Sequence, residues 1–316
     1  MPWHPIVEAS SGNTGNAMSM VAAAKGYKML VVMPAGMSKE RAAISRAFGA
    51  EVMTVGDFHV NDALDLAKEL GEQPGYFAPE QFENEWKIEE NRSWLGPEIL
   101  DQLPAGVRPE ALVVGVGTGR TLIGVGQAFR QVNPKAHLVA VEPDESCTLM
   151  CGEVGRHLIE GISDGFVPGI VDRHRDLVVD VVAVPSWQAI AEMRRLARQY
   201  GLFVGPSSGA HLIAARKYQA SHPQLEHVVT VLWTPARSTS ASTSSSSKPG
   251  GVRRLIGKRS WRTPLAGDED SRGNHQPACN LQGTELLRED ENGEERRQDG
   301  LQIRVARGMR GANALD

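Results

Sequence analysis

The sequence predicts an α/β fold built on doubly wound parallel sheets, and three observations lead to this prediction. Short apolar runs such as Tyr27–Met33 and Ala111–Val116 have the length and composition of buried parallel strands. Segments with helical periodicity, such as Leu122–Val132, separate these runs. Turns rich in glycine and serine follow several of the runs. Strands that alternate with helices in this way pair in parallel, with the helices covering the sheet.

The elements follow in a regular order along the first 232 residues. The first half is expected to contain strands near Ile6–Val7, at Tyr27–Met33 and at Glu51–Val55, and helices at Gly15–Ala24, Ser38–Phe48 and Val60–Leu70. Ser38 is of a residue type that caps helix N-termini, so it marks the start of its helix. The second half is expected to contain strands at Ala111–Val116, His137–Val141, Val178–Val182 and Val228–Leu232, and helices at Leu122–Val132, at Ser186–Arg198 and after Ser208.

Residues 233–316 differ in composition from the part before them. Ser238–Ser247 is almost entirely Ser and Thr, and the remainder is rich in Arg, Gly, Asp and Glu. So few large apolar side chains cannot offset the entropy lost when a chain is ordered. We therefore expect residues 1–232 to form the folded domain, in two lobes, and residues 233–316 to be largely disordered.

The overall composition excludes several classes of protein. The formal net charge of -4 argues against a nucleic-acid partner, and no apolar run approaches the ~18 residues of a membrane helix. Three cysteines in a chain of this length argue against a disulfide framework and fit the cytoplasm, as does the lack of a signal peptide. Cys147 and Cys151 are expected to be buried free thiols, because two thiols alone are a poor zinc site. No metal site is expected.

Three turns are candidate ligand sites, because ligands of parallel sheets bind where strand ends meet helix N-termini. The first is Ser10–Gly15, whose hydroxyls and backbone N–H groups suit a carboxylate or phosphate. The second is Gly115–Thr121, where glycines let the backbone approach a phosphate. The third is Gly205–Gly209, with two serines at a helix start. Each turn alone is also consistent with ordinary helix capping. The second turn, with Glu142 after the next strand, is also compatible with a nicotinamide dinucleotide site.

Taken together and in this order, the motifs resemble those of one enzyme family. They are Ser10-Ser-Gly-Asn-Thr-Gly15, Met33-Pro34, Ser38-Lys-Glu-Arg41 at a helix start, Gln81-Phe-Glu-Asn84, Gly96-Pro-Glu-Ile99, Gly115-Val-Gly-Thr-Gly-Arg-Thr121, Glu160-Gly-Ile162, Gly165-Phe-Val-Pro168 and Pro206-Ser-Ser-Gly-Ala210. The chain resembles the cysteine synthases (O-acetylserine sulfhydrylases), which are pyridoxal-phosphate enzymes of β-replacement with cystathionine β-synthase as a close relative. The resemblance covers roughly residues 5 to 232. It implies the two-lobed tryptophan synthase β-like fold, called fold type II.

The resemblance also implies roles for individual residues. Asn13 would bind the ring hydroxyl oxygen of pyridoxal phosphate, and Ser207 would face the pyridine nitrogen. The phosphate would lie in a cup formed by Gly117, Thr118, Gly119, Arg120 and Thr121. The substrate carboxylate would be held by Ser10, Ser11, Thr14 and Gln81, and Gly161 and Ile162 would line the substrate mouth.

The implied activity is the formation of L-cysteine from O-acetylserine and sulfide, by β-elimination and then addition. The implied partners are the amino-acid substrate, sulfide, a second copy of the chain and serine acetyltransferase. The family also needs a lysine, before the first turn, that holds the cofactor as a Schiff base. None of the nine residues that precede Ser10 is a lysine, so no catalytic residue is assigned. We expect a chain truncated at its N-terminus, with an incomplete first lobe and little or no activity as written.

Three further departures from the family pattern stand out. Arg120 occupies a position at which the family usually has glycine. The segment Glu85–Asn91 replaces a proline-containing stretch. After Leu232 the family's usual ending is replaced, and the Arg-rich sequence is typical of out-of-frame reading of GC-rich DNA, so we expect 233–316 to be a frameshift product. The alternatives are a non-catalytic scaffold remnant of the same family, a cystathionine β-synthase-like activity, and the nicotinamide-dependent enzyme.

Overall fold

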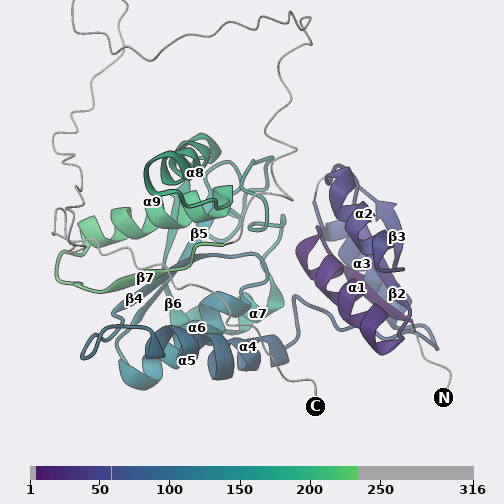
Figure 1. Ribbon diagram of the computed structural model, residues 1–316, viewed down its shortest axis with the longest axis horizontal. Helices are drawn as coiled ribbons and strands as arrows, with labels where there is room; N and C mark the ends of the chain where they lie inside the picture. The colour runs from purple at the N-terminus through teal and green to yellow at the C-terminus, as the bar shows by residue number, and fades with distance from the viewer. Residues whose placement is uncertain (1–4, 58, 234–316) are drawn as a thin grey trace, which may run out of the picture. The chain divides into compact units, whose positions relative to one another are not determined.

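The computed structural model describes residues 5–57 and 59–233, which form two parallel sheets (Figure 1). The strand orders are β1-β2-β3 in the first sheet and β6-β5-β4-β7 in the second. Every strand pair is parallel. The predicted α/β class and parallel pairing are therefore confirmed. Residues 234–316 lie outside the described part of the chain, so the expectations for the tail remain predictions.

The first sheet consists of β1 (Ile6–Ala9), β2 (Met29–Pro34) and β3 (Glu51–Val55). Its helices are α1 (Asn13–Lys25), α2 (Lys39–Ala47) and α3 (Asn61–Gly71). All six residues of β2 are buried, as expected for a central strand covered on both faces. Because side chains alternate across a strand, Leu30 and Val32 pack with α3, whereas Val31 and Met33 pack with residues of α1 and α2.

The second sheet consists of β4 (Ala111–Gly115), β5 (His137–Pro143), β6 (Val178–Val184) and β7 (Val228–Thr230). Leu112 and Val114 pack with α4 (Trp86–Glu90), α5 (Gly96–Asp101), α6 (Arg120–Val132) and α7 (Gly169–Arg173). Ala111 and Val113 face the opposite way, toward α8 (Ser186–Tyr200) and α9 (Pro206–Ser221). The two sets of helices lie on opposite faces of this sheet in Figure 1.

The short helices α4, α5 and α7 and an irregular turn after α4 were not expected from the sequence. The segment that replaces the family's proline-containing stretch forms α4 and continues into a π-helical turn, η1 (Asn91–Leu95). Gly124 of α6 faces this segment so closely that an added Cβ would lie 2.6 Å from the carbonyl oxygen of Ile88. The unusual segment is therefore packed on α6, the helix that begins at the expected phosphate cup.

The expectation that Cys147 and Cys151 are free thiols is wrong, because the structure joins them in a disulfide. The two Cα atoms are 5.4 Å apart, within the range that a disulfide spans. A single turn brings them together, since the N–H of Cys151 donates to the carbonyl of Cys147 at 2.9 Å. The small number of cysteines could not reveal this local geometry. In the described ranges, no helix is both long enough and apolar enough to cross a membrane.

Candidate active site

The first turn, Ser10–Gly15, is called the asparagine loop here, and its shape depends on Ser10. The Ser10 hydroxyl is buried and accepts hydrogen bonds from the N–H groups of Gly12 at 3.1 Å and Gly15 at 2.9 Å. Asn13 and Thr14 begin α1, with Asn13 exposed and Thr14 half-buried. The hydroxyl of Ser10 therefore organises the loop from within, while the side chains of Ser11, Asn13 and Thr14 are more exposed than that of Ser10.

The second turn, Gly115–Thr121, is the expected phosphate cup, and its glycines are required by close contacts. A Cβ on Gly117 would lie 2.6 Å from the carbonyl oxygen of Gly161, and a Cβ on Gly119 would lie 2.1 Å from Val171. Gly119 also has a φ of 84°, which residues other than glycine rarely adopt. It precedes α6, and no side chain caps this helix. The first N–H groups of α6 are therefore available to an anion.

The flanking side chains of the cup take different positions. Thr121 is buried, and its hydroxyl donates to the side-chain oxygen of Asn91 at 3.4 Å. Thr118 and Arg120 are half-buried. Lys87 of α4 lies near Arg120. The pKa of Lys87 is lowered to about 8, because burial and then the positive charge of Arg120 outweigh the charges of Glu8 and Glu90, which raise it. Arg120 therefore adds positive charge beside the expected phosphate position.

The third turn, Gly205–Gly209, begins α9. Ser208 is buried and donates its hydroxyl hydrogen bond to the carbonyl of Trp233 at 3.1 Å. Ser207 is half-buried, and its hydroxyl makes no hydrogen bond to another described residue. Gly209 packs against α8 so closely that a Cβ would lie 2.1 Å from the carbonyl oxygen of Ala189. Of the two serines, Ser207 is the one whose hydroxyl can serve a ligand.

His211, which the sequence did not single out, joins the second and third turns. Its Nε2 accepts the N–H of Gly115 at 2.8 Å, so its Nδ1 carries the proton and donates to the carbonyl of Val231 at 2.8 Å. The side chain is fully buried, and this burial lowers its pKa to about 4. His211 is thus a neutral group that fixes the strand end on which the phosphate cup begins.

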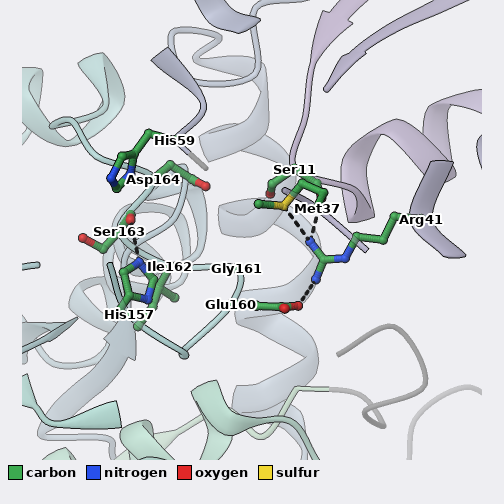
Figure 2. Close-up of a pocket in the computed structure, with 10 residues that line it drawn as sticks. All are labelled: Ser11, Met37, Arg41, His59, His157, Glu160, Gly161, Ile162, Ser163 and Asp164. Carbon is green, nitrogen blue, oxygen red and sulfur yellow. Dashed lines mark hydrogen bonds and ion pairs between the residues drawn. The ribbon is translucent and has the colours of Figure 1, made fainter. Parts of the chain in front are cut away.

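One pocket brings part of the predicted substrate set together (Figure 2). It is lined by Ser11, Met37, Arg41, His59, His157, Glu160, Gly161, Ile162, Ser163 and Asp164. Ser11, Gly161 and Ile162 were predicted to meet the substrate. Ser10, Thr14 and Gln81 do not line this pocket. The carbonyl of Gly161 is also the atom that faces Gly117, so the pocket adjoins the phosphate cup.

Gln81 lies behind the asparagine loop and is bound to β1. Its side-chain amide donates to the carbonyl of Ala9, and its backbone N–H donates to the Glu8 carboxylate at 3.2 and 3.3 Å. Gln81 is 3% exposed and Glu8 is 2% exposed. Burial raises the pKa of Glu8 to about 7. In this structure the amide of Gln81 stabilises the strand that carries the loop.

Asp164 is a pocket carboxyl group that sequence reasoning missed. Its Oδ2 lies 3.9 Å from the position that a Cβ on Gly117 would take, so it faces the cup as well as the pocket. Burial raises the pKa of Asp164 to about 6, and the charge of Arg41 opposes that rise. The signal available in the sequence was its place two residues after Ile162, one of the predicted mouth residues.

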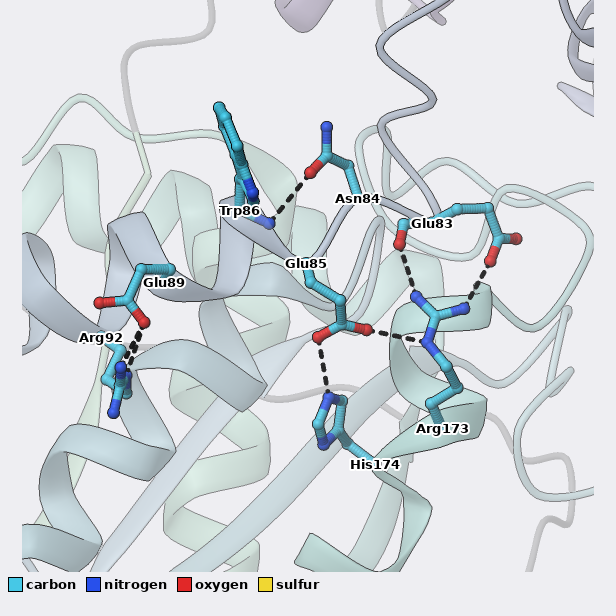
Figure 3. Close-up of polar contacts among 8 residues, drawn as sticks. All are labelled: Glu83, Asn84, Glu85, Trp86, Glu89, Arg92, Arg173 and His174. Atoms are coloured by element: carbon cyan, nitrogen blue, oxygen red, sulfur yellow. Dashed lines mark hydrogen bonds and ion pairs between the residues drawn. The ribbon is translucent and has the colours of Figure 1, made fainter.

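A cluster of ion pairs anchors the segment before α4 to α7 (Figure 3). Arg173 contacts Glu83 at 2.7 Å and Glu85 at 2.8 Å, and His174 contacts Glu85 at 3.1 Å. The pKa of Glu85 is lowered: burial raises it, but the hydrogen bonds and charges of His174 and Arg173 outweigh that effect. Trp86, beside this cluster, is 83% exposed. These contacts hold the unusual segment on the second sheet's helices.

Comparisons with known proteins identify the family to which this site belongs. The family model described as pyridoxal-phosphate dependent enzyme matches residues 4–233. The chain therefore belongs to the pyridoxal-phosphate-dependent enzymes. It is 41% identical to a cysteine synthase of Staphylococcus aureus over 232 residues, which are 73% of this chain and 74% of that protein. Within the family it is a cysteine synthase-type member.

The structural neighbours confirm fold type II, which the resemblance implied. One is a hydrogen sulfide-producing enzyme of Fusobacterium nucleatum, with 36% identity, a TM-score of 0.70, and coverage of 75% of this chain and 72% of that one. Another is an O-acetylserine-dependent cystathionine β-synthase of Helicobacter pylori, with 33% identity, a TM-score of 0.69, and coverage of 75% and 76%.

Pyridoxal phosphate is the cofactor of this family, and the phosphate cup fits its phosphate group. The glycines leave room for close backbone approach, and α6 presents N–H groups that no side chain occupies. A dianionic phosphate is stabilised by such a helix N-terminus. None of the ten residues that line the pocket is a lysine. The pocket residues therefore include no group of the type that holds this cofactor covalently.

Proposed function

We propose that this chain carries the cofactor and substrate sites of a cysteine synthase, which forms L-cysteine from O-acetylserine and sulfide. The observation that carries the proposal is the position of Gly161. Its carbonyl abuts Gly117 of the phosphate cup, while the residue itself lines the pocket with Ser11 of the asparagine loop. A cofactor phosphate in the cup and an amino acid in the pocket would therefore be neighbours, as β-replacement requires.

Each side chain has a role in this proposal. The backbone of residues 117–121 holds the phosphate, with Arg120 adding positive charge. Asn13 orients the cofactor ring, and Ser207 offers a hydroxyl to its pyridine nitrogen. Pyridoxal phosphate supplies the electron sink for loss of the β-substituent. Ser10, Ser11, Thr14 and Gln81 bind the substrate carboxylate, with Ser10 and Gln81 also supporting the loop, and Gly161 and Ile162 shape the mouth.

The wider context of the proposal follows from the family. We infer that the working unit is a homodimer in the cytoplasm, and that serine acetyltransferase is a partner. Because no pocket residue is a lysine, the described residues by themselves are expected to bind the cofactor non-covalently and to show little turnover. The second candidate is a cystathionine β-synthase-like reaction, which uses the same sites and differs in the nucleophile.

Binding of pyridoxal phosphate and of pyridoxal to the full chain tests the proposal. Fluorescence titration should give at least about tenfold tighter binding for the phosphorylated compound, because the α6 N-terminus contacts only the phosphate. Gly119→Ala should remove this preference, since its Cβ would lie 2.1 Å from Val171. Gly152→Ala is the matched control: its φ of 71° is similarly strained, but no atom lies within 4 Å of its Cβ.

The outcomes separate the alternatives. Equal binding of the two compounds would contradict the phosphate cup. Binding of a nicotinamide dinucleotide in place of pyridoxal phosphate would support the alternative hypothesis of a nicotinamide-dependent enzyme. A well-folded chain that binds neither would support the non-catalytic scaffold.

A further inference from the structure

Arg41 of α2 is almost fully buried between two loops of the candidate site. It is 3% exposed, which is rare for arginine unless its charge is paired. Its Nη1 donates to the carbonyl of Ser11 at 2.6 Å, and its Nη2 forms an ion pair with Glu160. Figure 2 shows the guanidinium between these two partners. One side chain therefore contacts both the asparagine loop and the 160–164 loop.

The stem of Arg41 also shapes the asparagine loop. A Cβ on Gly12 would lie 2.6 Å from Cδ of Arg41, so the loop backbone runs directly against the arginine side chain. Gly12 has a φ of 149°, in the region that favours glycine. The backbone between Ser11 and Asn13 therefore follows a path that leaves space for the Arg41 side chain.

The other partner, Glu160, begins the loop that forms the substrate mouth. The next residue, Gly161, touches the phosphate cup through its carbonyl, and Ile162 lines the pocket. At the far end of the same loop, the carbonyl of Asp164 accepts the N–H of Val60 at 3.4 Å. A shift of Glu160 would therefore be transmitted to the mouth and to the wall of the cup.

We propose that Arg41 is a positioning residue that sets the asparagine loop and the 160–164 loop relative to each other, so that an amino-acid carboxylate meets a preformed site. The proposal rests on the proposed function for the identity of the ligand. The coupling of the two loops is independent of the proposed function, because it follows from the contacts of Arg41. Truncation of Arg41 removes a donor from the Ser11 carbonyl and a cation from Glu160 at the same time.

Amide hydrogen exchange of the full chain, read by mass spectrometry, tests the coupling without any ligand. Arg41→Ala should speed exchange in residues 10–15 and 160–164 by about tenfold or more, with β2 and α6 unchanged. Arg41→Lys keeps the charge but cannot contact both partners with a planar fork, so one of the two loops should loosen. Glu160→Gln should loosen the 160–164 loop. Arg46→Ala, at the exposed end of the same helix, is the matched control.

Calorimetry with L-serine and L-serinamide adds the ligand readout. The wild type should bind L-serine more tightly than L-serinamide, which lacks the carboxylate, and Arg41→Ala should lose about tenfold of this affinity. The proposal would be overturned if both loops exchanged at wild-type rates in the Arg41→Lys variant and in the Glu160→Gln variant. These two variants decide the question if Arg41→Ala does not fold. Failure of the wild type to prefer L-serine, with the exchange result as expected, would instead count against the proposed substrate class.

Discussion

Acid should destabilise this protein through His211, and the size of the effect can be worked out from its environment. The buried ring has a pKa of about 4, against about 6.5 for an exposed histidine. The unfolded chain therefore binds a proton more readily than the folded protein between these two values, and stability falls as the pH is lowered through this window. A difference of about 2.5 pKa units corresponds to about 3 kcal/mol of unfolding free energy. The contribution is fully present above pH ~6.5 and lost by pH ~4.

The perturbation that isolates this contribution is His211→Gln, which keeps a hydrogen-bond acceptor for the N–H of Gly115 but does not titrate. Urea unfolding, followed by tryptophan fluorescence at a series of pH values, gives the free energy of unfolding of both proteins. The wild-type value minus the variant value should fall by about 3 kcal/mol between pH ~6.5 and pH ~4. The carboxyl groups of Glu8 and Asp164 titrate in both proteins and cancel in the difference.

Ser208→Ala serves as the control, because it removes a buried hydrogen bond of the same helix and leaves every titratable group in place. Its difference from the wild type should stay constant over the same window. A wild-type minus His211→Gln difference that stays constant from pH ~6.5 to pH ~4 would refute the reasoning. In that case the His211 ring is already charged in the folded protein, or its pKa is the same in the folded and unfolded states.

Three further predictions follow from the same structure. Asp164→Asn should raise the free energy of unfolding by up to about 3 kcal/mol at pH 7.5 and leave it unchanged near pH 4, because the carboxyl's raised pKa makes its ionisation unfavourable in the folded state; urea unfolding at both pH values checks this. Arg173→Ala should cost less than about 1 kcal/mol despite two ion pairs, since they are exposed to solvent, and a larger loss in urea unfolding would show that the cluster is structural. Cys147 and Cys151 should resist alkylation in the native oxidised protein and react after reduction, as peptide mass spectrometry would show; labelling without reductant would contradict the disulfide.

The order of elements could be predicted because it depends on local patterns. The runs of apolar residues in β2 and β4 already indicate strands covered on both faces, whatever their neighbours are. The first two glycine-bearing turns could also be placed, since they come at the ends of β1 and β4. The disulfide and the short helix α4 depend on the precise course of irregular segments, for which no periodicity exists.

The candidate site could be predicted less completely, because side-chain direction depends on distant contacts. Ser10 and Gln81 were expected to hold the substrate, which stays a prediction; the sequence did not reveal that Ser10 also accepts hydrogen bonds within the loop and that Gln81 donates to β1. No role was assigned to Arg41, Asp164 or His211, for the complementary reason. Each has its main partner far away in the sequence, as with Arg41 and Glu160, which are 119 positions apart. A charged residue within an amphipathic helix gives no sign of such a partner.

The same long-range contacts explain why the cup and the substrate mouth cannot vary independently. Gly117 is a glycine because the carbonyl of Gly161 occupies the space of a side chain, and Gly119 is a glycine because Val171 does so. A larger residue at position 117 would have to displace the 160–164 loop, which also lines the pocket, and a larger residue at position 119 would have to displace α7. Arg41 imposes a matching constraint from the other side, since Gly12 must remain small beside its stem. The backbone shapes that suit a phosphate and a carboxylate are therefore set by residues distant in the sequence, and substitutions at Gly161, Val171 or Arg41 should alter binding without contacting the cofactor.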